Sequence, residues 1–229
     1  MIRKEGLTDL FFDLDHTIYD FDKNSALTFD AIFNEMQLKG VGDFMTHFKP
    51  INDYYWDKFA KEEISHDTLR YGRLKDTFDA IDVAVNDDQI YYIADAFIGN
   101  LTNYNHVFDG AHETLNALKK NYRLHIITNG PSLVQEKKLK NSKLEQYFET
   151  ITNSEKAGVK KPNPIIFQHA LQLANVKAEQ SLMIGDNIQA DVHGALNVGM
   201  QVIWFNEFQL QSDVQVAEVQ QLKQLLDIL

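Results

Sequence analysis

Five short apolar runs constrain the fold of this chain more than any other feature. They lie at 7–14, 123–127, 148–152, 181–185 and 200–205. Apolar runs of this length, bounded by polar residues, are typical of buried β-strands. The later runs are separated by helix-like segments at about 132–141, 163–174 and 189–198. Strands that alternate with helices predict an α/β fold, with a Rossmann-like parallel sheet at its core.

A long helical stretch interrupts this alternation. Residues 20–107 are almost free of Pro and Gly and follow a helical periodicity. A crossover between parallel strands needs only about a dozen residues, so this stretch is too long to be a simple connection. We therefore expect an inserted all-helical cap domain at 20–107, with the core domain formed by 1–19 and 108–229.

The insertion is rich in aromatic residues. It holds 15 of the 26 Phe, Tyr and Trp residues of the chain. The simpler interpretation is that these rings form the core of a small helical bundle, and the alternative is that some line a ligand cleft. The residues concerned include Phe44, Phe48, Tyr54, Tyr55, Trp56, Phe59, Tyr91 and Tyr92.

The C-terminal segment predicts one more helix. Ser212 or Asp213 is suited to capping its start. An apolar stripe would then be formed by Val219, Leu222, Leu226 and Leu229. A stripe with this spacing is typical of a helix that packs on the core.

Charge and cysteine content exclude several classes of partner and site. The net charge of −11 would repel a nucleic-acid polymer or an anionic membrane. The absence of cysteine excludes disulfides and thiolate ligands, so any metal must be bound by oxygen or imidazole. The first residues contain neither a signal-peptide core nor a membrane span, which predicts a cytoplasmic protein. The sequence does not indicate an oligomeric state.

Four polar motifs follow the predicted strands. They are the Asp13 and Asp15 pair, Thr128-Asn129-Gly130, Lys160-Lys161-Pro162, and Asp186 with Asp191. Each alone is an ordinary turn, cap or solvated-surface signal. Open α/β sheets bind their ligands at the carboxyl ends of the strands, where all four motifs would meet. Their joint placement therefore predicts one functional site.

The acidic residues of these motifs favour a divalent cation. Several carboxylates at one sheet edge repel each other unless a cation neutralises them. Mg²⁺ prefers oxygen ligands and commonly accepts an oxygen of a substrate phosphate. A lysine nearby would balance the remaining phosphate charge. The pattern therefore predicts a magnesium site that handles a phosphate group.

The same motifs resemble those of haloacid dehalogenase-like hydrolases. The strings "FFDLDHTIYDF", "GVKKPNPIIF" and "MIGDNIQADVHGA" are most similar to the pyrimidine 5′-nucleotidase branch of that family. The resemblance implies a helical cap domain inserted after the first motif. His16 departs from the pattern, because many members have Gly there, and a nucleotidase-like subgroup carries His. We interpret His16 as a marker of that branch.

The resemblance implies roles for individual residues. Asp13 would be the nucleophile that forms an aspartyl-phosphate, and Asp15 would be the general acid and base. Thr128 and Asn129 would hold the phosphoryl oxygens, while Thr17 would stabilise the turn.

The third and fourth motifs have implied roles as well. Lys161 would stabilise the negative charge of the nucleophile and of the phosphoryl group, with Lys160 as the second candidate. The implied magnesium ligands are the Asp13 carboxylate, the main-chain carbonyl of Asp15 and Asp186. Asp191 would orient waters or Lys161 from behind these ligands.

Several functions are compatible with this pattern. The dehalogenase branch lacks the second acid, so Asp15 argues for phosphate chemistry on a small phosphate monoester. The branch resemblance implies nucleoside 5′-monophosphates, pyrimidine ones above all, as substrates. Charge supports this expectation, since the insertion carries 16 acidic residues against 8 Lys and Arg and should disfavour a second anionic group. The alternatives are a sugar-phosphate or phosphoglycolate phosphatase, a phosphosugar mutase, and a non-catalytic binding protein of the same fold.

Overall fold

The computed structural model describes residues 2–229, and the chain divides into two compact units. One unit comprises the chain up to Asp20 together with Asn105–Leu229. The other is the segment Phe21–Tyr104, which is helical throughout its regular structure. No helix between residues 2 and 229 is long and apolar enough to cross a membrane.

The first unit is built on a six-stranded sheet in the order β3-β2-β1-β4-β5-β6, and all its strand pairs are parallel. Its strands are β1 (Asp9–Phe12), β2 (Arg123–Thr128), β3 (Thr150–Asn153), β4 (Ser181–Gly185), β5 (Gln201–Phe205) and β6 (Ala217–Val219). This sheet confirms the predicted α/β fold with a helical insertion. Strand β1 lies between β2 and β4, so the residues that follow it emerge near the middle of the carboxyl edge.

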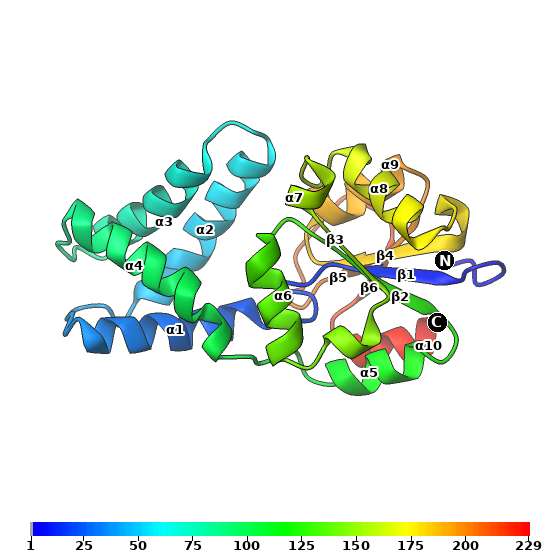
Figure 1. Ribbon diagram of the computed structural model, residues 1–229, viewed down its shortest axis with the longest axis horizontal. Coiled ribbons are helices and arrows are strands. Elements are labelled where there is room, and N and C mark those ends of the chain that lie inside the picture. Colours follow the sequence, from blue (N-terminus) through cyan, green and yellow to red (C-terminus); the bar gives the residue numbers. More distant parts are fainter. Residues whose placement is uncertain (1) are drawn as a thin grey trace. The chain divides into compact units, whose positions relative to one another are not determined.

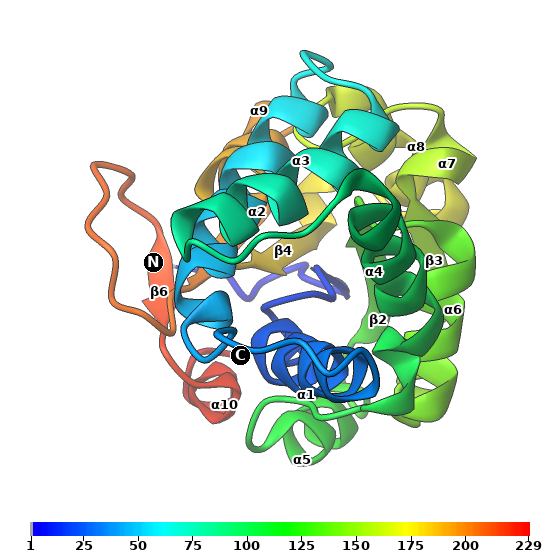
Figure 2. The ribbon, with the colours of Figure 1, turned by 90° about the vertical axis from the view of Figure 1, so that its left-hand side faces the viewer.

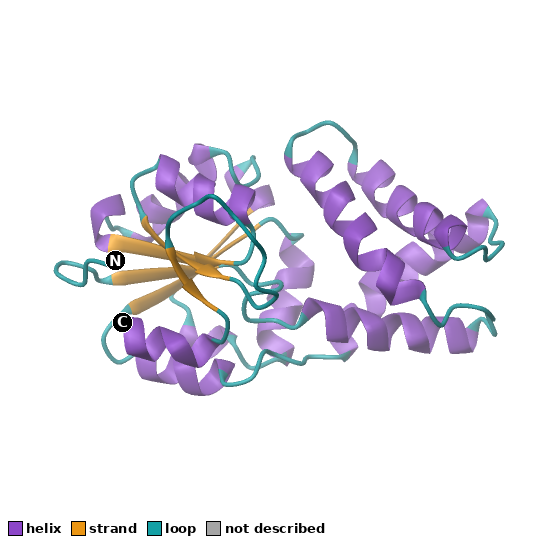
Figure 3. Cartoon of the chain, turned by 180° about the vertical axis from the view of Figure 1, so that it is seen from behind, coloured by secondary structure: helices purple, strands orange, loops and turns teal. Residues whose placement is uncertain are grey.

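Helices cover both faces of this sheet (Figures 1 and 3). Helices α8 (Pro164–Ala174) and α9 (Gly194–Asn197) lie on one face, and α5 (Ala111–Leu118) and α10 (Leu225–Ile228) lie on the other. The remaining helical segments of this unit are α6 (Ser132–Asn141), α7 (Ser154–Ala157), the 3₁₀ turns Glu145–Tyr147, Ala178–Gln180 and Leu222–Gln224, and a π-helical turn at Ile188–His193. Two covered faces explain why the central strands β1 and β4 are buried along their whole length.

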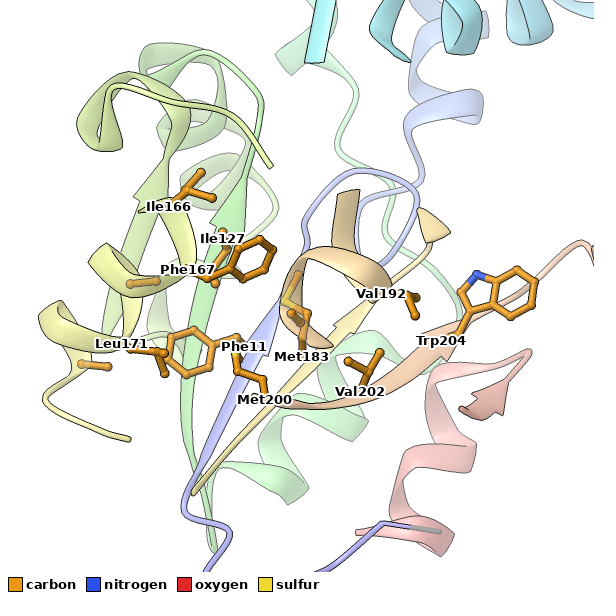
Figure 4. Close-up of a cluster of buried hydrophobic side chains, with 13 residues drawn as sticks. Phe11, Ile127, Ile166, Phe167, Leu171, Met183, Val192, Met200, Val202 and Trp204 are labelled. Carbon is orange, nitrogen blue, oxygen red and sulfur yellow. The ribbon is translucent and has the colours of Figure 1, made fainter. Parts of the chain in front are cut away.

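A dense apolar cluster joins the sheet to α8 and α9 (Figure 4). The sheet contributes alternate residues of neighbouring strands, including Phe11, Met183 and Trp204. Helix α8 contributes Phe167 and Leu171, which are four residues apart and therefore lie on one face of the helix. This packing holds the strand ends in place beneath the polar motifs.

The second unit is a bundle of helices, shown from its end in Figure 2. Its elements are α1 (Phe21–Glu35), α2 (Phe44–Ala60), α3 (His66–Ala80), α4 (Asp87–Asn100) and a 3₁₀ turn at Leu101–Asn103. Helix α2 packs along α3, and α4 contacts both α1 and α3. Helix starts are defined by the sequence: Ser65 caps α3, and Asn86 forms a capping box with Gln89 on α4.

Aromatic rings fill the core of this bundle. Phe29 lies at its centre, with its ring centroid 4.8 Å from that of Phe44, 4.9 Å from that of Phe48 and 4.4 Å from that of Phe97. The bundle-core interpretation is therefore correct for Phe44 and Phe48, which are buried. The exposed rings are Tyr54, Tyr91 and Tyr92.

The predicted C-terminal helix is wrong for most of its length. Val219 ends strand β6, Leu222 begins a 3₁₀ turn, and only Leu225–Ile228 is α-helical. Val219, Leu222 and Leu225 are buried, whereas Leu226 is exposed. Val219 lies in the edge strand, while the turn at Leu222 and helix α10 contact α5, so these residues do not form one helical stripe. In a short apolar segment, period 2 and period 3.6 are difficult to distinguish, and pairing with β5 decides between them.

Candidate active site

The first motif extends directly from the central strand. The backbone N–H of Asp13 donates to the carbonyl of Ile184 at 2.9 Å, so Asp13 continues the parallel ladder beyond β1. His16 then turns the chain, with φ of 60°, a left-handed conformation that glycine adopts without strain. The geometry explains why glycine suits this position and why a His there must tolerate a positive φ. The turn leaves Asp13 buried and Asp15 partly exposed.

Lys161 lies at the centre of the site and is 2% exposed. Its Nζ donates to Asp13 Oδ1 at 2.5 Å, to Asp191 Oδ1 at 2.6 Å and to the carbonyl of Ile127 at 2.9 Å. Burial alone would lower the pKa of Lys161, but the charges of Asp13 and Asp191 outweigh it and raise this pKa. Lys161 is therefore a permanent cation held between two carboxylates.

Three carboxylates surround this single lysine. Oxygen atoms of Asp13, Asp186 and Asp191 all lie within 4.8 Å of one another. Burial raises the pKa of Asp13 and of Asp186 well above the usual value of 3.8, and repulsion from Asp191 raises both further. Lys161 offsets only part of this charge. The donor set is hard oxygen with an excess of negative charge, which fits Mg²⁺.

Neighbouring groups hold Asp186 and Asp191 in place. Thr17 Oγ1 donates to Asp186 Oδ1 at 3.1 Å, so Thr17 connects the first motif to the fourth. Trp204 Nε1 donates to the carbonyl of Asp186 at 2.8 Å, and the N–H of Asn187 donates to Asp191 Oδ2 at 3.1 Å. The acids are thus oriented by the sheet and the turn that follows β4.

The second motif is connected to the lysine loop. Asn129 Nδ2 donates to the carbonyl of Lys161 at 3.0 Å, and Asn129 Oδ1 accepts from the N–H of Lys161 at 2.7 Å. Thr128 is buried, and its hydroxyl oxygen accepts from the N–H of Gly130 at 3.2 Å. The side chain of Asn129 therefore fixes the backbone that carries Lys161.

Two residues of this site were absent from the sequence-based prediction. Lys138 Nζ donates to Asp15 Oδ1 at 2.6 Å, and Gln135 Nε2 donates to Asp15 Oδ2 at 2.9 Å. Gln135 Nε2 also donates to Thr128 Oγ1 at 2.7 Å. Burial alone would raise the pKa of Asp15, but Lys138 and the hydrogen bonds outweigh it and lower this pKa. One sequence signal could have identified them. Gln135 and Lys138 are three residues apart on the predicted helix 132–141, so they share one face of a helix that follows Thr128.

The sheet, the insertion after its first strand and this acid and lysine cluster define a class of protein. A model of the family described as haloacid dehalogenase-like hydrolase matches residues 10–205. The chain belongs to this family, as its four motifs predict.

Particular relatives extend over almost the whole chain. The chain is 29% identical over 228 residues to PynA, a pyrimidine 5′-nucleotidase of Streptococcus pneumoniae, covering 96% of this chain and 94% of PynA. It is 31% identical over 229 residues to a glyceraldehyde 3-phosphate phosphatase of Pyrococcus furiosus, covering 95% of this chain and 92% of the relative. A solved structure of the HAD-hydrolase YfnB from Bacillus subtilis, bound to magnesium, has a TM-score of 0.87 at 26% identity and covers 97% of this chain and 98% of YfnB.

Proposed function

We propose that this phosphatase hydrolyses nucleoside 5′-monophosphates, pyrimidine ones preferentially, through an aspartyl-phosphate formed on Asp13. The observation that carries the chemistry is the contact of Lys161 Nζ with Asp13 Oδ1 at 2.5 Å inside a cluster of carboxylates. Lys161 is positioned to stabilise the negative charge of both the attacking carboxylate and the phosphoryl group.

In the first step, a carboxylate oxygen of Asp13 attacks phosphorus and the bond to the ester oxygen breaks. Asp15 gives its proton to the leaving alkoxide, so the products are an alcohol and the aspartyl-phosphate. Lys138 favours the ionised form of Asp15 before substrate arrives, because it lowers the pKa of that carboxyl. A phosphate dianion next to Asp15 acts in the opposite direction and favours the protonated acid that the step requires.

In the second step, water attacks the phosphorus of the aspartyl-phosphate and Asp15 accepts a proton from that water. The acyl phosphate bond breaks, inorganic phosphate leaves, and the Asp13 carboxylate is restored. The hydrogen bonds from Gln135 and Lys138 keep the Asp15 carboxylate in one position for both steps. One side chain therefore serves as acid and then as base, as microscopic reversibility requires.

The carboxylate cluster fits a magnesium ion. The residues that would hold it are Asp13 and Asp186, with the main-chain carbonyl of Asp15, while Asp191 orients Lys161 through their contact at 2.6 Å. A bound Mg²⁺ would neutralise the carboxylates and polarise a phosphate oxygen. The raised pKa values of Asp13 and Asp186 support this assignment, because burial and repulsion from Asp191 disfavour the ionised carboxylates and a bound cation would favour them.

Two observations support nucleotides as substrates. PynA, a pyrimidine 5′-nucleotidase, is similar along 96% of this chain. The segment 20–107 carries 16 acidic residues against 8 Lys and Arg, which disfavours a substrate with a second anionic group. A nucleoside presents only a neutral sugar and base. Phe44 and Phe48 are buried in the bundle core, so neither ring is available to stack on a base.

Glyceraldehyde 3-phosphate is the second candidate substrate. The Pyrococcus furiosus phosphatase is as similar to this chain as PynA is. Glyceraldehyde 3-phosphate also lacks a second anionic group, so the charge of the insertion does not discriminate against it.

A phosphate-release screen with magnesium tests the proposal. The panel compares UMP, dUMP and AMP with glyceraldehyde 3-phosphate, glucose 6-phosphate and phosphoglycolate, and Asp13→Asn serves as the inactive control. We expect the highest kcat/KM for UMP or dUMP, by roughly tenfold or more over the sugar phosphates. Equal kcat/KM values across the panel would refute the nucleotide preference and leave the phosphatase mechanism intact.

A further inference from the structure

The hydroxyl of Thr128 accepts two hydrogen bonds. Thr128 ends strand β2 and is 2% exposed. Its Oγ1 accepts from the N–H of Gly130 at 3.2 Å and from Gln135 Nε2 at 2.7 Å. A threonine hydroxyl has two acceptor positions and one proton, so these bonds leave only the proton available. No residue within 2–229 accepts this proton, which can therefore be donated to a ligand.

Asp15 sets the orientation of the Gln135 amide. Gln135 Nε2 donates to Asp15 Oδ2 at 2.9 Å as well as to Thr128 Oγ1, which uses both hydrogens of the amide. Lys138 Nζ contacts Asp15 Oδ1 at 2.6 Å, and an ionised carboxylate can only accept hydrogen bonds. Turning the amide over would place Oε1 against Asp15 Oδ2. The amide keeps its orientation although Oε1 is buried and has no hydrogen-bond partner among residues 2–229.

Gly130 provides the space that this amide occupies. Gln135 is fully buried, and a Cβ on Gly130 would lie 2.5 Å from both Cδ and Nε2 of Gln135. The φ of Gly130 lies outside the left-handed region, so the position uses the absence of a side chain and not backbone freedom. The amide thus packs directly on the backbone of the second motif. This packing holds Nε2 between Thr128 and Asp15.

We propose that Gln135 is a positioning residue that makes the Thr128 hydroxyl a donor to the phosphoryl group and couples this hydroxyl to Asp15. Phosphoryl oxygens are acceptors, so a hydroxyl that can only donate is suited to them. Without Nε2, the hydroxyl regains an acceptor position and its proton is no longer confined to the ligand. One amide thus orients both the phosphate donor and the general acid and base. The inference rests on the proposed phosphoryl chemistry at Asp13, but not on the identity of the alcohol.

A double-mutant cycle on phosphate affinity tests this proposal. Inorganic phosphate is titrated calorimetrically, with Mg²⁺ present, into the full chain as wild type, Thr128→Val, Gln135→Met and the double variant. We expect Thr128→Val to bind phosphate roughly tenfold more weakly, since a hydrogen bond to a charged oxygen is lost, and Gln135→Met roughly threefold to tenfold more weakly. In the Thr128→Val background, Gln135→Met should have almost no further effect, because no hydroxyl remains to be positioned. Gln172→Met, at an exposed position on α8, is the matched control and should bind as wild type does.

Thr128→Ser provides a second background in case the buried valine disturbs folding. It keeps the hydroxyl, so its phosphate affinity should be close to that of wild type, and Gln135→Met should weaken it as in wild type. Losses that multiply in the Thr128→Val double variant would overturn the proposal. So would an affinity that Gln135→Met leaves unchanged, or wild type that binds no phosphate.

Turnover of p-nitrophenyl phosphate separates this inference from the proposed function. Gln135→Met should raise KM as well as lower kcat, because it affects both Thr128 and Asp15. A lower kcat with unchanged KM and phosphate affinity would show that Gln135 acts through Asp15 alone, and the coupling would be wrong. Absence of turnover by wild type would refute the phosphatase proposal, whereas the phosphate titrations would still decide the role of Gln135.

Discussion

Lys138 and Asp15 form a contact of 2.6 Å between residues 123 positions apart in the sequence. Lys138 is 3% exposed and lies on α6, which follows the Thr128-Asn129-Gly130 motif. Gln135, one turn earlier on the same helix, contacts the second oxygen of Asp15. Helix α6 therefore controls the orientation of the residue that we assign as general acid and base.

Lys138→Met should reduce kcat by roughly tenfold to a hundredfold while the protein stays folded, because general acid–base catalysis depends on a positioned carboxyl group. The loss should be larger for an alkyl ester such as UMP than for p-nitrophenyl phosphate, whose leaving group needs little protonation. Lys137→Met, at an exposed position on the same helix, is the control. Equal losses for both substrates would assign Lys138 a structural role only.

Asp13→Asn should abolish turnover, since an amide is a poor nucleophile of nearly the same shape. The variant should also be more stable than wild type in the absence of metal, because it removes a buried carboxylate whose pKa is raised by burial and by repulsion from Asp191. Each kcal/mol gained corresponds to about 2 to 4 °C in Tm for a chain of this size. Phosphate release and thermal melts measure both effects, and near-normal turnover by the folded variant would remove Asp13 from its role.

A divalent cation should be required for turnover, because the carboxylate cluster repels a phosphate dianion. Chelation should inhibit reversibly, and added Mg²⁺ should restore the rate. Asp186→Ala should lose most of this response, whereas Asp213→Ala, in an exposed loop, should retain it. Full activity in excess chelator would contradict the metal assignment.

The stability of the metal-free protein should depend on Asp186 in a pH-dependent way. The pKa of Asp186 is raised in the folded state, so the folded chain binds this proton more tightly than the unfolded chain. Below the ordinary value of 3.8 the group is protonated in both states and has no effect. As pH rises from there toward the folded pKa, the folded state loses stability.

Asp186→Asn lacks this titration, so its Tm should exceed that of wild type by a margin that grows as pH rises. Thermal melts in chelator across this range measure the margin. Excess Mg²⁺ should reverse the order at neutral pH, because the ion binds the wild-type carboxylate. A margin that stays constant with pH would show that Asp186 is not the group that titrates.

The sequence by itself was sufficient for five of the six strands and for the order of the motifs that follow them. Period and capping are local properties, so helix α6 was predicted at 132–141 and occurs at Ser132–Asn141. The parallel sheet followed from the alternation of strands and helices, and a parallel sheet brings the ends of distant strands to one edge. Asp13, Lys161, Asp186 and Asp191 therefore meet as expected.

Tertiary structure alone decided which partners these side chains have. The side-chain amide of Asn129, a predicted ligand of the phosphoryl oxygens, hydrogen-bonds to the backbone of Lys161, and no local sequence pattern indicates that contact. In the sequence, nothing distinguishes Lys138 from an exposed lysine. Its contact with Asp15 arises because α6 packs beside the turn that carries Asp15. The segment around Val219 became a strand because β5 offered an unpaired edge. Each of these outcomes depends on the energy of a contact between residues far apart in the chain, which becomes defined only when packing brings them together.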